Sequence, residues 1–104
     1  MKLFMYSIYD SATCAYMRPF FIQTDAAAMR EFTGIALNAE TSVGMNPEDY
    51  SLFRIGVFDD NTLSKSTFET PECLATALEV VSKAQTITPG SLKESENATV
   101  SNGA

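Results

Sequence analysis

The sequence contains no histidine and no tryptophan, and only two of its 104 residues are cysteines. Histidine is the side chain that most often acts as a general base or metal ligand near neutral pH, so its absence removes the commonest catalytic partner. Two isolated thiols, Cys14 and Cys73, do not make a zinc site, and a reducing cytosol disfavours a disulfide. We therefore expect no metal and no cofactor, with Cys14 in a loop and Cys73 on a helix face.

Motifs of common enzyme classes and segments that direct a chain to a membrane are also absent. The chain has no glycine-rich phosphate loop, no nucleophile elbow and no HExxH motif, so we expect no enzymatic activity. No apolar run approaches the roughly 18 residues of a membrane-spanning helix, and the first residues carry no signal-peptide pattern. These absences predict a cytosolic protein that does not engage a membrane.

Basic residues are scarce as well. Seven Lys and Arg stand against 13 Asp and Glu, which gives a net charge of −6. Proteins that bind nucleic acid usually present a basic face to the phosphates, so the overall field of this chain repels DNA. Binding would require a local cluster, and only Arg18 and Arg54 lie among aromatic residues.

Four carboxylates bracket the stretch PEDYSLFRIGVFDD, with Glu48-Asp49 near its start and Asp59-Asp60 at its end. An extended chain rises about 3.3 Å per residue, which places the two pairs roughly 30 Å apart. They cannot share a metal ion or a substrate within one chain. We interpret each pair as a solvated end of a strand.

Residue patterns in the first half predict strands and one long helix. Residues 2–9 carry apolar side chains on both faces, which favours a central strand. Residues 16–23 predict a second strand, in which Pro19 favours an edge or a bulge because it lacks an N–H group. Thr24 or Asp25 can cap a helix that runs to about Asn38. Its apolar side contains Ala28, Phe32, Ile35 and Ala36.

The second half begins with a loop at residues 39–50 and a third strand from Ser51 to Phe58. A short fourth strand is predicted from Thr62 to Thr67. Thr70-Pro71-Glu72 has the residue types preferred at a helix start, so we place a second helix from Thr70 to about Ala84. Its apolar stripe contains Leu74, Ala77, Leu78 and Val81. Residues 85–104 are polar and without periodicity, which is typical of disorder.

These elements predict one α+β domain over residues 1–84, ordered β-β-α-β-(β)-α, with a disordered tail at 85–104. Pairing the third strand with the first gives a wholly antiparallel sheet of order 2-1-3. Both helices can cover one face of this sheet. The other face keeps part of the aromatic set, which is a large apolar surface for a monomer. We therefore expect a homo-oligomer or a partner on that face.

Aromatic side chains beside arginines can stack the bases of single-stranded nucleic acid. If alternation holds along each strand, Arg18 shares a face with Tyr16 and Phe20, and Arg54 shares one with Leu52 and Phe58. Tyr16, Arg18, Phe20 and Arg54 are therefore the candidate nucleic-acid-binding residues. The alternative interpretation is a core that is rich in Phe and Tyr.

Three segments resemble a known family: MYSIYD at 5–10, YMRPFFIQTD with the following MREF at 16–32, and PEDYSLFRIGVFDD at 47–60. Together they resemble the small nonstructural proteins of gokushoviruses, which are single-stranded DNA phages of the microvirus family. The likeness covers about residues 1–82 in order and spacing. It implies a protein made in the cytoplasm of the infected bacterium and absent from the virion.

Members of that family are often described as DNA-binding. They are also likened to protein C of the phiX-type microviruses, which acts on the replication complex and promotes the switch to single-strand synthesis and packaging. The resemblance brings no catalytic residues. It implies a regulator whose partners are the phage replication initiator or host replication proteins. A single-stranded DNA-binding module and an oligomeric interaction module are the alternatives.

Overall fold

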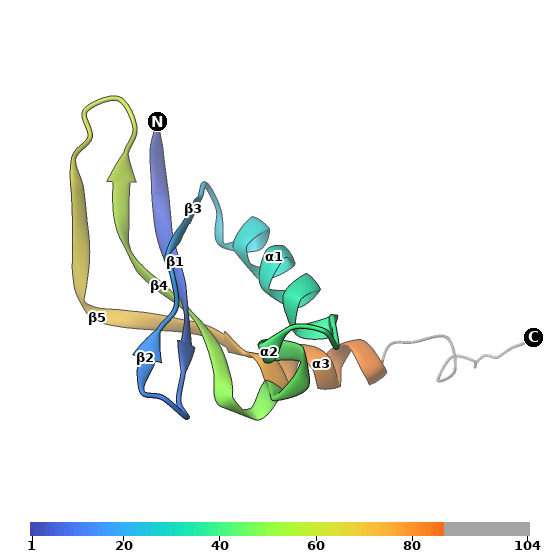
Figure 1. Ribbon diagram of the computed structural model, residues 1–104. Coiled ribbons are helices and arrows are strands. Elements are labelled where there is room, and N and C mark those ends of the chain that lie inside the picture. Colours follow the sequence, from blue (N-terminus) through green and yellow to red (C-terminus); the bar gives the residue numbers. More distant parts are fainter. Residues whose placement is uncertain (87–104) are drawn as a thin grey trace, which may run out of the picture.

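The computed structural model describes residues 1–86, which form an antiparallel sheet with helices against one side (Figure 1). The strands follow the order β2-β1-β4-β5, and β3 also pairs with β1. The predicted α+β class and the 2-1-3 order are confirmed, with β4 as the third predicted strand. The strands are β1 (Lys2–Asp10), β2 (Ala15–Tyr16), β3 (Phe20–Ile22), β4 (Tyr50–Asp59) and β5 (Lys65–Thr76).

The second predicted strand is split in two. β2 and β3 both pair with β1. The residues between them, Met17 to Pro19, lie outside both strands, although the Met17 N–H still donates to the Ile8 carbonyl at 2.8 Å. Pro19 therefore lies in a break at the edge of the sheet, where its missing N–H costs no ladder bond. The break also interrupts the alternation of side chains between Tyr16 and Phe20.

The first predicted helix is confirmed as α1 (Asp25–Leu37). The hydroxyl of Thr24 accepts a hydrogen bond from the Ala27 N–H at 3.2 Å, which satisfies one of the free donors of the first turn. Asp25 adds a carboxylate at the positive end of the helix dipole. Ala28, Phe32 and Ala36 are buried, as their helical spacing predicts.

The predicted start of the second helix at Thr70 is wrong. β5 continues through Thr70-Pro71-Glu72 to Thr76, and the helix α3 spans Ala77–Thr86. The true start is a reciprocal cap: the Glu79 N–H donates to the Thr76 hydroxyl at 3.1 Å, and the Thr76 N–H donates to the Glu79 carboxylate at 3.0 Å. Pairing with β4 outweighs the local helix signal, and Cys73 therefore lies on a strand rather than on a helix.

Other boundaries also differ from the prediction. The fourth strand, predicted from Thr62 to Thr67, spans Lys65–Thr76 as β5. The predicted loop at 39–50 contains the short helices α2 (Ser42–Met45) and η1 (Pro47–Asp49). The hydroxyl of Thr41 caps α2 by accepting the Gly44 N–H at 2.9 Å. Gln85 and Thr86 belong to α3. The rest of the predicted disordered tail lies outside the described residues.

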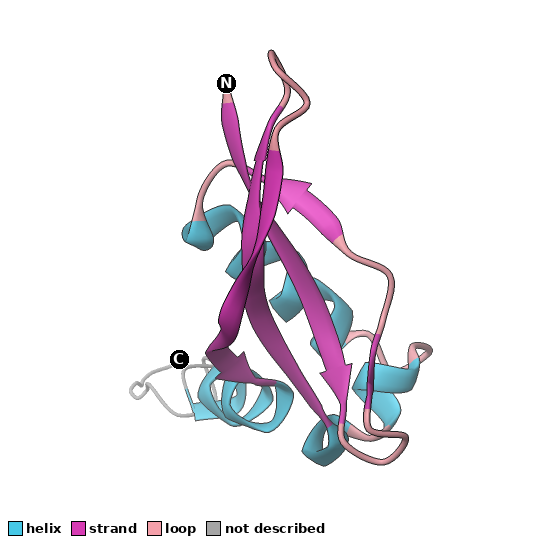
Figure 2. Ribbon diagram, turned by 90° about the vertical axis from the view of Figure 1, so that its left-hand side faces the viewer, coloured by secondary structure: helices cyan, strands magenta, loops and turns pink. Residues whose placement is uncertain are grey.

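The core lies between the sheet and the helices. Figure 2, turned to view the side away from α1, shows the strands in front of that helix. Tyr6 and Leu52 from the two central strands and Phe32 from α1 are fully buried. α2, β5 and α3 complete the same cluster, so all three α-helices cover one face. The remaining members are Ile8, Ala28, Ala36, Val43, Tyr50, Ala75, Ala77 and Val80.

Candidate functional site

The four candidate residues do not form one platform. Tyr16 is in β2, and Arg18 lies in the break between β2 and β3; both are exposed. Phe20 and Arg54 instead lie on the sheet face that packs against the helices. Tyr16 and Arg18 lie two residues apart at the edge of the sheet. Phe20 and Arg54 lie on its helix-covered face.

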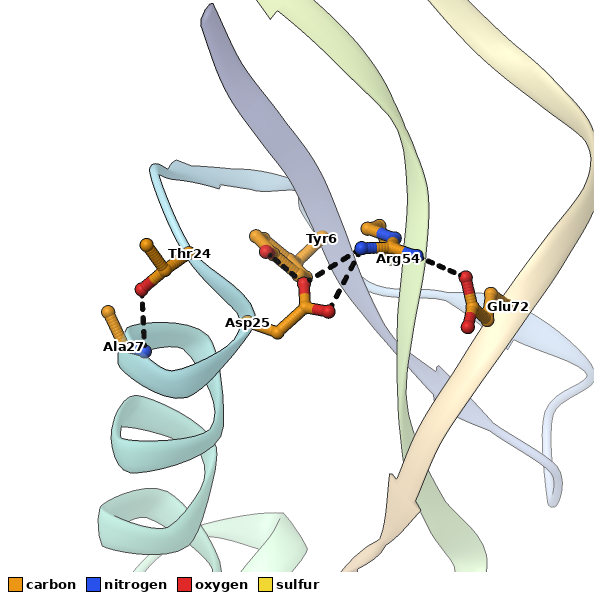
Figure 3. A network of polar contacts seen from close by, with 6 residues as sticks. All are labelled: Tyr6, Thr24, Asp25, Ala27, Arg54 and Glu72. Carbon is orange, nitrogen blue, oxygen red and sulfur yellow. Dashed lines mark hydrogen bonds and ion pairs between the residues drawn. The ribbon is translucent and has the colours of Figure 1, made fainter.

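Arg54 is held in a network of charged and polar groups on the helix-covered face (Figure 3). Its Nη1 donates to both carboxylate oxygens of Asp25, at 2.9 and 3.2 Å, and its Nη2 donates to the Glu72 carboxylate. The Tyr6 hydroxyl donates to Asp25 at 2.6 Å. The network therefore ties β1, β4 and β5 to the first turn of α1.

The surroundings of Arg54 favour its charged form. Its hydrogen bond to Glu72, with the nearby Asp25, raises the pKa of the guanidinium. The guanidinium carbon lies 4.9 Å from the centroid of the Phe4 ring, a cation–π geometry. Burial and the bond to Asp25 also raise the pKa of Tyr6. Arg54 is thus an internal structural group, with two carboxylates where a phosphate contact was expected.

Phe20 belongs to the core as well. Its ring stacks on Tyr6 with the centroids 5.7 Å apart, directly across the β1–β3 ladder. Phe58 does not share the face of Arg54, although simple alternation predicts that it does. Tyr6 pairs with Arg54 and Met5 pairs with Gly56, so Ile55 between them has no partner on β1. This bulge shifts alternation by one residue, and Phe58 lies on the face opposite Arg54.

Tyr16 lies in an aromatic cluster on the face away from the helices. Its ring centroid is 4.9 Å from that of Tyr9 and 5.7 Å from that of Phe53. Tyr16 pairs with Tyr9 across the β1–β2 ladder, and 46% of its surface is exposed. The cluster joins three strands, β2, β1 and β4, into one apolar area.

A second aromatic pair lies on the same face. The ring centroids of Phe21 and Phe58 are 5.3 Å apart, and Phe21 is 47% exposed. The buried Met5 pairs with Phe21 on one side and with Gly56 on the other. It fills the space left by the glycine: a Cβ at Gly56 would lie 2.4 Å from the Met5 methyl. We call this surface the open face and define it by Leu3, Tyr9, Tyr16, Phe21, Phe53 and Phe58.

Both thiols border the open face. Cys73 pairs with Phe53 across the β4–β5 ladder, and burial raises the pKa of its thiol. A hydrogen bond with Cys14 raises the pKa of Tyr9, which places Cys14 beside the aromatic cluster. Cys14 lies in the turn after β1, as predicted for a loop thiol. A raised pKa keeps the Cys73 thiol protonated, which is unlike the activated thiolate of a catalytic cysteine.

The carboxylate pairs around β4 lie at its opposite ends, as predicted. Glu48 and Asp49 are in η1, whereas Asp59 and Asp60 lie beside the N-terminal ammonium, which donates to Asp60 at 2.8 Å. Within residues 1–86, no three His, Cys, Asp or Glu side chains gather as metal ligands. In the same part of the chain, no helix is long and apolar enough to cross a membrane.

The sequence analysis did not predict that Tyr9, Phe21, Phe53 and Phe58 lie on one surface, although all four residues are aromatic. The alternation of β1 alone would have separated Tyr9 from Tyr6. The positions of Phe21 and Phe58 depend on the break at Pro19 and on the bulge at Ile55. Pro19 indicates an irregularity without fixing which face Phe21 takes, and the bulge at Ile55 leaves no clear signal in the sequence.

Comparison with known proteins identifies a phage family. The family model described as phage ORF5 protein matches residues 3–80, which include all of the sheet except Lys2 and reach the start of α3. No curated protein and no solved structure matches the chain.

Proposed function

Because the chain belongs to the phage ORF5 protein family, we propose that it is a gokushovirus nonstructural protein that regulates genome replication. It would promote the switch to single-strand synthesis and packaging by binding the phage initiator or host replication proteins. It would act in the host cytoplasm without enzymatic activity and would be absent from the virion. The observation that supports the proposal is the family match over residues 3–80, a range that contains all three segments on which the gokushovirus resemblance rests.

The arrangement of the fold is consistent with a binding role. Arg54 is paired with both Asp25 and Glu72, so these three charges are used within the domain. The open face instead exposes aromatic side chains without using them in the main core. A protein that regulates through contacts needs such a surface more than it needs reactive groups.

A complementation experiment tests this role. A phage with the gene deleted is supplied with the wild-type protein from a plasmid, and strand-specific hybridisation follows duplex and single-stranded genomes over time. We expect the deletion to lower the ratio of single-stranded to duplex genomes and the wild-type gene to restore it. An unchanged ratio in the deletion phage would reject the proposal.

A single-stranded DNA-binding module is the second candidate. Its support is the exposed ring of Tyr16 near Arg18, on an edge where no partner strand covers them. Because Arg54 is paired internally, only Arg18 of the two arginines is available to neutralise a phosphate. Fluorescence anisotropy with single-stranded and duplex DNA at about 50 and 200 mM salt tests this candidate.

Replacing Arg18 with alanine should then lower the slope of log affinity against log salt by about one. Arg30→Ala is the matched control, because Arg30 is an exposed arginine of α1 on the opposite side of the sheet. An equal slope for the wild type and Arg18→Ala would reject Arg18 as a phosphate contact.

A further inference from the structure

We propose that the open face binds the open face of a second copy of the chain, so that two sheets pack against each other around a twofold axis. The inference depends on the fold and on the distribution of charge. It is independent of the replication role, because it concerns the purified protein alone.

The open face has the chemistry of a protein–protein contact. Tyr16 and Phe21 are each nearly half exposed although both rings already contact aromatic neighbours. Tyr9, Phe53 and Phe58 lie on β1 and β4, which pair along nearly their whole length, so the centre of the surface is preformed. Aromatic side chains with few rotatable bonds lose little entropy when they are buried, which makes them frequent anchors of interfaces.

Charge identifies a second copy as the occupant. The ladder-paired strand residues on the open face include no carboxylate. The charged residue among them is Lys65, which pairs with Phe58. Asp10 instead pairs with Tyr50, Asp59 with Lys2, and Glu72 with Arg54, all on the other face. Two chains with a net charge of −6 can therefore meet here without opposing carboxylates.

Other occupants fit less well. Single-stranded DNA carries one phosphate per nucleotide, whereas this face offers Lys65 and, at its edge, Arg18 within an acidic protein. The chain beyond the described residues, 87–104, contains only three large apolar residues, Ile87, Leu92 and Val100. That segment has too little apolar surface to match two aromatic clusters.

The size of the face predicts a reversible dimer. Strands about 4.8 Å apart and roughly seven residues long give four strands a planar footprint of about 400 Å². Stable interfaces usually bury about 800 Å² of accessible surface per partner, so this contact is at the small end. A self-complementary contact closes at two copies, because the same surface is used on both. We expect a dissociation constant in the micromolar range, on the order of 10–100 μM.

Sedimentation velocity of the full chain from about 1 to 500 μM tests the proposal directly. The wild type should shift from monomer towards dimer with rising concentration. Tyr16→Asp and Phe21→Asp each place a charge against the twofold partner and should weaken the dimer at least tenfold. Leu78→Asp is the matched control: Leu78 is 50% exposed, but it lies on α3, and its change should leave the dimer intact. Circular dichroism confirms that each variant is folded.

Several results would overturn the proposal. One is a wild-type chain that stays monomeric at 500 μM, a result that needs no variant. A second is weakening by Leu78→Asp equal to that by Phe21→Asp. A third is association only after a thymidine oligonucleotide is added, which would assign the face to nucleic acid. A dimer through this face should also persist when NaCl rises from about 50 to 500 mM, whereas a DNA-bridged one should dissociate.

Discussion

The two faces of the sheet are built from the same strands and differ in how their side chains are satisfied. On the helix-covered face, Tyr6 and Leu52 are fully buried and Arg54 has two carboxylate partners. On the open face, Tyr16 and Phe21 touch other rings yet remain nearly half exposed. The comparison teaches that stability resides on one face, whereas the other face retains surface for a partner.

The largest effect should come from the helix-covered face. Phe32 is fully buried, so Phe32→Ala removes its packing and leaves a cavity, which should lower the free energy of unfolding by about 3–5 kcal/mol. Phe21→Ala removes a half-exposed ring of the same chemistry and should cost about 1 kcal/mol or less. Urea denaturation of both variants measures the difference. Equal losses would mean that the open face is part of the main core.

Breaking the charged network should have the next largest effect. Arg54→Met leaves Glu72 without its partner and Asp25 with only the Tyr6 hydroxyl. Since the side chains of Asp25 and Glu72 are 42% and 56% exposed, water screens the loss, and we expect about 1–2 kcal/mol. Arg30→Met on the exposed side of α1 is the control and should change stability little. The denaturant midpoints of the two variants measure these losses, and equal midpoints would contradict a stabilising role for the Arg54 network.

The helix cap at Thr76 offers a third test of the difference between the two faces, because α3 packs only on the helix-covered face. Thr76→Ala removes the acceptor of the Glu79 N–H and should cost about 1 kcal/mol. Thr70→Ala alters the same residue type on β5, away from any helix start, and should be nearly neutral. A larger loss for Thr70→Ala would restore the helix start predicted from the sequence.

The smallest effect at neutral pH concerns the Tyr6 hydroxyl, but this effect depends on pH. Burial and the hydrogen bond to Asp25 raise the pKa of Tyr6 above its usual value of 10.0. Neutral Tyr6 therefore contributes fully to stability below about pH 10, and the contribution is lost as the pH rises above 10. Tyr6→Phe should flatten this alkaline decline. Thermal melts between pH 8 and 11 test it; identical slopes for both proteins would contradict the assignment to Tyr6.

Much of the helix-covered face could be predicted from the sequence. The doubly apolar β1 and the helical spacing of Ala28, Phe32 and Ala36 are local patterns, so the sheet order and α1 followed from them. The start of α3 could not be fixed in this way, because Thr70 and Thr76 both begin a capping pattern. Pairing of β5 with β4 decides between them, and it depends on residues distant in the sequence.

The candidate site was less predictable for a similar reason. The orientation of Phe58 relative to Arg54 reverses at a single unpaired residue, Ile55. The two aromatic clusters lie on the same face because of both the bulge at Ile55 and the break before Phe20. The sequence shows the aromatic residue types, whereas their grouping on one face depends on irregular backbone that periodicity cannot reveal.

The irregular course of β5 also affects how copies of this chain can aggregate. β5 is the outer strand at one edge of the sheet. Glu72 pairs with Arg54 and Thr67 pairs with Gly56, so residues 68–71 have no ladder partners and bulge out opposite the single residue Ile55. Figure 1 shows the strand turning sharply along its length. A straight strand from another molecule cannot align with this edge, and Pro71 withholds one N–H donor. The outer edge is therefore a poor template for fibril growth, although the adjacent face is rich in aromatic rings.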